Sequence, residues 1–103
     1  MSYRVEVFDA DEASPLERQA AARRFCMALE ASLGDAALVP PLYRAYLRLV
    51  QAYGEAPGPD VLSDAERLVF EQWQAAELAA VSAAFGPNRY MGDAMYEIRL
   101  QDD

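Results

Sequence analysis

Helix-start signals followed by glycine stops divide most of the chain into three long segments. A serine with a glutamate three residues later begins the first segment at Ser14 and the third at Ser63, and two prolines, Pro40 and Pro41, precede the second. Such serines cap free backbone N–H groups, and proline is compatible with the first helical turn. The segments end at the glycines 34, 54 and 86, which favour helix termination. The spacing therefore predicts helices over about 15–33, 42–53 and 64–85.

Short alternating segments flank the three helices. Apolar residues at positions 3, 5 and 7, and again at 96, 98 and 100, alternate with charged ones, a period typical of half-buried strands. The predicted class is α+β, predominantly α, with a three-helix core and short terminal strands in the order β-α-α-α-β. If successive elements run antiparallel, the two strands pair in parallel, with Arg4 opposite Glu97 and Glu6 opposite Arg99.

Chain length and apolar content favour one compact domain over residues 1–103. The chain has 103 residues, 53% of them hydrophobic. A chain of this size forms one domain with one core.

The charge balance is strongly acidic and restricts the kinds of partner. Seventeen acids oppose nine bases, for a net charge of −8, and every base is arginine. This charge disfavours nucleic acid and anionic membranes and favours a basic protein. The N-terminal residues contain no apolar signal core, and no apolar run approaches the roughly 20 residues that cross a bilayer. We expect a cytoplasmic protein, and the Arg- and Ala-rich composition is typical of GC-rich bacteria.

Missing residue types exclude several kinds of chemistry. The chain has no histidine and one cysteine, so imidazole general bases, internal disulfides and cysteine-based zinc sites are excluded. We expect no cofactor, no metal and no catalytic residue. Asp9, Asp11 and Glu12 could offer oxygen ligands to Ca²⁺ or Mg²⁺, but solvated acids before a helix explain them better. Cys26 lies on an apolar stripe and is predicted to be a buried, slowly reacting thiol.

The second helix is more apolar than a surface helix requires. Its apolar side chains cover roughly 220° of its circumference, whereas packing on one side needs about 100°. The helix is therefore either sandwiched inside the fold or exposed to a partner. Tyr and Arg are enriched at binding hot spots. The interface candidates on this helix are Tyr43, Arg44, Leu47, Arg48 and Val50.

The segment before the final strand supplies further interface candidates. Arg89, Tyr90, Met91 and Met95 lie close together there, and methionine suits an adaptable binding surface. Packing of this segment over the helices is the alternative explanation.

Two functions remain open from the sequence. The preferred one is a small acidic bacterial protein-binding module, such as a regulator, an inhibitor or immunity-type protein, or an accessory subunit. Its partner would be a basic protein or a second copy of this chain. The alternative is a small enzyme or enzyme subunit that uses carboxylate, Tyr or Arg chemistry, with Glu66, Glu71 and Glu77 as candidate acids. A deep pocket around a desolvated acid would favour the enzyme, and a broad Tyr/Arg/Met surface would favour the binding module.

Overall fold

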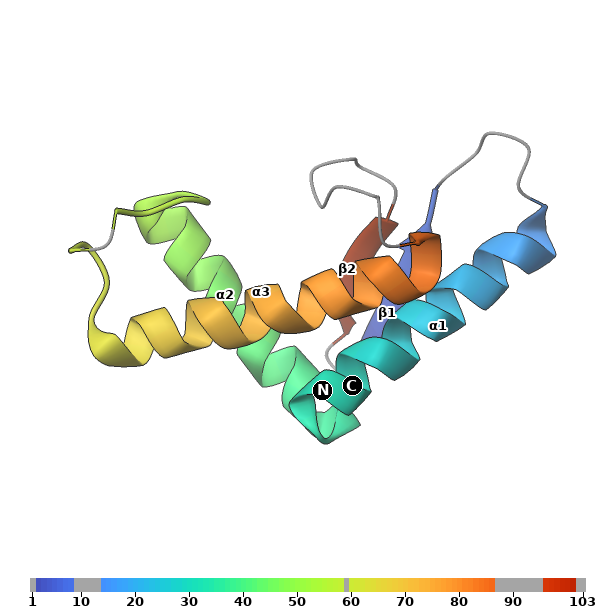
Figure 1. The fold of residues 1–103 in the computed structure, drawn as a ribbon, viewed down its shortest axis with the longest axis horizontal. Helices are drawn as coiled ribbons and strands as arrows, with labels where there is room; N and C mark the ends of the chain where they lie inside the picture. The colour runs from blue at the N-terminus through green and yellow to red at the C-terminus, as the bar shows by residue number, and fades with distance from the viewer. Residues whose placement is uncertain (1, 9–13, 59, 87–95, 102–103) are drawn as a thin grey trace.

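The fold is mostly helical, with a two-stranded sheet made by the two ends of the chain. The computed structural model describes residues 2–8, 14–58, 60–86 and 96–101. Its elements are β1 (Ser2–Val7), α1 (Pro15–Leu33), the short 3-10 helix η1 (Ala36–Leu38), α2 (Val39–Tyr53), α3 (Asp64–Phe85) and β2 (Tyr96–Gln101). In Figure 1, α1 and α2 form the arms of a V, and α3 crosses in front of the strands. The predicted class, α+β and mainly α, is confirmed.

The predicted helix caps form at the predicted residues. The Ser14 hydroxyl accepts a hydrogen bond from the Glu17 backbone N–H at 3.2 Å. Ser63 and Glu66 cap each other reciprocally, at 3.2 Å and 2.9 Å. Gly34 adopts a left-handed φ of 89° at the end of α1. The first and third helices therefore begin and end as predicted.

The second helix begins earlier than the sequence suggested. α2 starts at Val39, with Pro40 and Pro41 inside its first turn, and η1 precedes it. The first four N–H groups of a helix have no partner within the helix, so prolines there break no hydrogen bond. The predicted start at Leu42 was wrong because these prolines belong to the helix.

The core lies mainly between α1 and α3. Its largest fully buried side chains are Trp73, Phe25, Leu29, Val39 and Val81. Small residues on both helices are also buried, and they let the two backbones approach closely.

One arginine ties α1 to the end of α3. Arg24 donates from Nε and Nη2 to the carbonyl oxygens of Ala83 and Ala84, at 3.1 Å and 3.0 Å. The last carbonyls of a helix have no partner within it and carry partial negative charge. The Arg24 guanidinium therefore supplies hydrogen-bond donors to two of the free carbonyl groups at the C-terminal end of α3.

The strands are antiparallel, so the predicted parallel pairing was wrong. Val5 pairs with Ile98, Arg4 with Arg99 and Glu6 with Glu97. The prediction counted every helix as a reversal of direction, but the α1 segment and the segment that follows it meet at 89°. The path from α1 to α3 thus amounts to one reversal, and these two helices run in opposite directions in Figure 1. The apolar sets of the strands still share one face, with Val5, Val7 and Ile98 buried.

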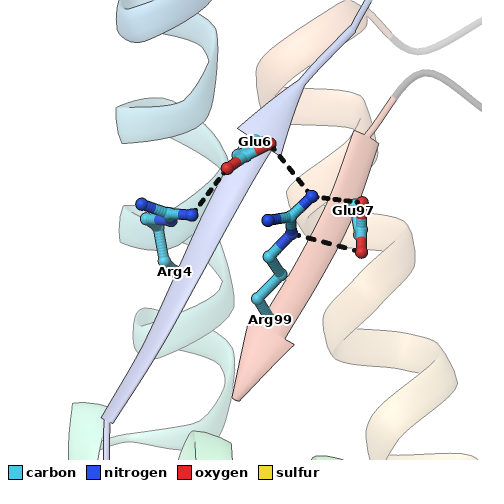
Figure 2. Close-up of polar contacts among 4 residues, drawn as sticks. All are labelled: Arg4, Glu6, Glu97 and Arg99. Carbon is cyan, nitrogen blue, oxygen red and sulfur yellow. Dashed lines mark hydrogen bonds and ion pairs between the residues drawn. The ribbon is translucent and has the colours of Figure 1, made fainter. Parts of the chain in front are cut away.

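Like charges lie opposite each other on the outer face of the sheet, and ion pairs along and across the strands offset them. Figure 2 shows that Glu6 lies between two arginines, with its carboxylate oxygens 2.7 Å from Arg4 and 3.5 Å from Arg99. Arg99 also contacts Glu97 on its own strand at 3.2 Å. The alternating charges of the sequence therefore suit the antiparallel register as well as the parallel one.

Candidate protein-interaction groove

Helix α2 packs on α3 through two tyrosines and leaves much of its surface open. The Tyr43 ring lies 4.7 Å from the Trp73 ring, and the Tyr46 ring lies 5.1 Å from Phe70, between ring centroids. The fully buried residues of α2 are confined to its first turn, at Val39 and Pro40. The excess of apolar surface predicted for this helix therefore lies along the sides of the α2–α3 contact.

One side of that contact is a half-open groove of about 710 Å³. Helices α2 and α3 form its walls, and Tyr96 of β2 contributes to them. Leu47 and Leu78 expose 36% and 51% of their surface beside it. We call this the acidic groove, and it is lined by Tyr43, Tyr46, Leu47, Val50, Glu55, Gln74, Ala75, Glu77, Leu78 and Tyr96.

Glu77 is the half-buried carboxylate of the acidic groove. The Tyr96 hydroxyl donates a hydrogen bond to its Oε2 at 2.9 Å. The Tyr96 ring is in turn held by Phe25 and Phe85, at centroid distances of 4.7 Å and 6.1 Å. Burial raises the pKa of Glu77, and the hydrogen bond from Tyr96 opposes this shift only partly. The fold thus holds this carboxylate in a fixed, partly desolvated position.

The tyrosines around Glu77 remain protonated at neutral pH. Burial, and after it the charge of Glu77, raises the pKa of Tyr43, of Tyr46 and of Tyr96. Among the described residues that line the acidic groove, the charged side chains are the two carboxylates Glu55 and Glu77. The groove therefore combines aromatic faces, exposed leucine and negative charge.

The predicted interface residues divide into three groups. Tyr43, Leu47 and Val50 line the acidic groove. Arg44 and Arg48 also lie on α2 but do not line the groove. Arg44 is half-buried and interacts with another residue, whereas Arg48 is exposed. The other four lie outside the described residues: Arg89, Tyr90, Met91 and Met95.

The sequence did not assign Tyr96 to this site and considered Glu77 only as a catalytic acid. The two residues are 19 positions apart and meet only because β2 packs beside α3. One signal in the sequence could have indicated the role of Tyr96: the alternation of apolar and charged residues in the last strand places Tyr96 on the face that packs against the core.

The other candidate acids have different surroundings. Glu66 belongs to the capping box, and the hydrogen bond it accepts from the Ser63 backbone lowers its pKa. Glu71 is exposed on α3. Of the three acids, Glu77 alone lines the acidic groove.

Cys26 lies beside Tyr3 and is half-buried, less enclosed than predicted. Burial raises the pKa of its thiol. The nearby Tyr3 hydroxyl donates to Glu30 at 2.7 Å. A raised pKa lowers the thiolate fraction at neutral pH, which supports the predicted slow reaction.

A second groove lies on the other side of α2. It measures about 690 Å³ and is lined by apolar residues and uncharged polar ones, among them Leu33, Leu38 and Leu42. Helix α2 therefore separates an acidic groove from an uncharged one.

Within residues 2–8, 14–58, 60–86 and 96–101, no group of three or more acidic, Cys or His side chains could hold a metal ion. Asp9, Asp11 and Glu12 lie outside these residues, so the predicted absence of a metal stays a prediction.

No protein-family model, curated protein or solved structure matches this chain. In the described residues, no single helix is long and apolar enough to cross a membrane. One pair of segments, 15–33 with 36–53, reaches the required length and hydropathy only together, and it is bent by 89°.

Proposed function

We propose that this protein is a small protein-binding module whose acidic groove holds a basic partner protein. The observation that carries the proposal is the composition of the acidic groove: exposed leucine, three tyrosines and two carboxylates along one side of α2. Aromatic side chains provide contact area, and exposed apolar groups mark interaction surfaces on soluble proteins. The net charge of −8 adds long-range attraction for a basic partner.

Charge favours a different protein over a second copy of this chain in this groove. A second copy would bring a chain of net charge −8 against the carboxylates Glu55 and Glu77. Like charges across an interface cost affinity, whereas a basic surface gains it. The same argument disfavours nucleic acid, whose phosphates carry the same sign as the groove.

A matched pair of leucine variants tests this function. Leu78 and Leu68 lie on α3 and are exposed by 51% and 54%, and Leu68 is outside the groove lining. Leu78→Lys and Leu68→Lys therefore change charge equally at similar cost to the fold, and a lysine in the groove repels a basic partner. Each protein would be used as bait in extract of the source organism, and the captured partner would then be purified and titrated by calorimetry.

We expect a basic partner that wild type and Leu68→Lys bind equally and that Leu78→Lys binds at least about tenfold more weakly. Affinity should also fall as salt rises. Equal affinity of the two variants would show that the acidic groove is not the binding surface.

An enzyme that uses Glu77 as a general acid is the second candidate, favoured by the raised pKa of this carboxyl. Its groove would take a small molecule. Native mass spectrometry of protein purified from the source organism would then show an added small mass that Leu78→Lys reduces.

A further inference from the structure

The acidic groove contains a cluster of four side chains that suits one particular kind of group. Glu77 accepts a hydrogen bond from Tyr96, while Tyr43 and Tyr46 line the same groove from α2. The charge of Glu77 acts on all three phenols, which places the four side chains within electrostatic reach of one another. We call these residues the anchor site: Tyr43, Tyr46, Glu77 and Tyr96.

We propose that the anchor site binds a single arginine side chain of the basic partner; this step rests on the proposed function. The guanidinium would meet the Glu77 carboxylate, and its flat face and aliphatic stem would pack on the tyrosine rings. Carboxylates pair with guanidinium in a planar arrangement. The faces of aromatic rings attract cations, and arginine does so more often than lysine.

The state of Glu77 in the isolated chain supports a cationic ligand. Tyr96 is its hydrogen-bond partner, and none of the ion pairs seen between described residues involves Glu77. A partly buried carboxylate without a cation is costly, so a positive group gains more there than beside a solvated acid. Glu55, the other carboxylate in the groove, adds attraction of the same sign.

Arginine fits the anchor site better than lysine for two physical reasons. Its guanidinium is planar and stacks on aromatic faces, whereas the lysine ammonium is compact. The guanidinium is also more weakly hydrated, so it loses less on entering a half-buried site. A site with three tyrosines beside one carboxylate should therefore bind the planar guanidinium of arginine more tightly than the compact ammonium of lysine.

The test uses small probes that represent one side chain. N-acetyl-arginine amide would be titrated into isotope-labelled protein, with the lysine and citrulline analogues as comparisons. Citrulline has nearly the same shape as arginine but no charge. NMR shifts of the Glu77 carboxyl carbon and of the tyrosine rings report binding at the site itself.

We expect the arginine probe to bind with a Kd on the order of 1 mM, since one side chain makes few contacts. The lysine probe should bind more weakly, and citrulline should give no saturable shift. Glu77→Gln should weaken the arginine probe at least about tenfold. Glu71→Gln is the control, because it removes the same charge from an exposed position on the same helix.

Equal shifts with citrulline and arginine, or equal arginine binding by Glu77→Gln and Glu71→Gln, would overturn the anchor site. The thermal midpoint of each variant confirms that it is folded. The proposed function fails separately: a partner that loses affinity with Leu78→Lys but not with Glu77→Gln uses the groove without this anchor. A partner unaffected by Leu78→Lys does not use the groove.

Discussion

The surroundings of Glu77 in the fold disfavour its charged form. Burial raises its pKa, so the protonated form is favoured more in the folded state than in the unfolded chain. A group with a raised folded pKa contributes its full stability below its unfolded pKa and loses it as pH rises through the folded pKa. The groups facing it from α2 and β2 are phenols, which do not neutralise it. A charge kept at such a cost is typical of a functional site.

Glu77→Gln should therefore stabilise the protein at pH 7. Glutamine can still accept the Tyr96 hydrogen bond but carries no charge. In urea unfolding, we expect a higher midpoint than wild type at pH 7 and no difference at pH ~3, where the glutamate is protonated in both states. The matched variant Glu71→Gln should leave the midpoint unchanged at both pH values. A lower midpoint for Glu77→Gln at pH 7 would contradict the assigned cause of the shift.

At the residue scale, three of the interface candidates from the sequence line the acidic groove, but the sequence did not bring Glu77 and Tyr96 together there. Tyr43, Leu47 and Val50 follow from helical periodicity, which is local. The role of Glu77 depends on Tyr96, and that contact arises only when β2 packs beside α3. Periodicity describes one element at a time, so it could not bring these two residues together.

Among the structural elements, the helix starts depend on identified side-chain caps. Ser14→Ala and Ser63→Ala should each lower the free energy of unfolding by about 1 kcal/mol. The two losses should be similar, because the Glu66 side chain accepts from the Ser63 backbone N–H, which the alanine variant keeps. Chemical denaturation measures both losses. Wild-type midpoints for the two variants would mean that these caps do not hold the helix starts.

One guanidinium adds a polar contact to the packing of α1 against α3. Arg24→Met keeps much of the side chain's apolar contact but removes two hydrogen bonds to the last turn of α3. We expect a loss of about 1–2 kcal/mol in the free energy of unfolding. Arg23→Met, one position away on an exposed site, is the control and should cost less than about 0.5 kcal/mol. Equal effects of the two substitutions would show that the contact with α3 contributes nothing.

Element types were predictable from the sequence, but their directions were not. Caps, glycine stops and alternation are local signals, and they located three helices and two strands. Strand direction depends on the 89° bend between α1 and the segment after it, and no local signal in the sequence indicated that angle. Alternating charges did not decide the register either, because Glu6 can pair with Arg4 and Arg99 in the antiparallel sheet.

At the scale of the whole molecule, the angled helices explain why a small chain has open grooves. The Cα radius of gyration is 14.0 Å, with extents of 44 × 31 × 21 Å. A compact chain of this length would have a radius near ~13 Å. In Figure 1, α2 diverges from α1 as one arm of the V. Both grooves lie along α2, and only one of them is acidic.

The central claim is that the acidic groove holds a basic protein, and site-specific photo-crosslinking in the source organism tests it most directly. A photoreactive phenylalanine analogue would replace Leu78 in one strain and Leu68 in another. We predict a cross-linked product from position 78, containing a partner rich in arginine, and none of that product from position 68. The same product from both positions, or from position 68 alone, would contradict the claim.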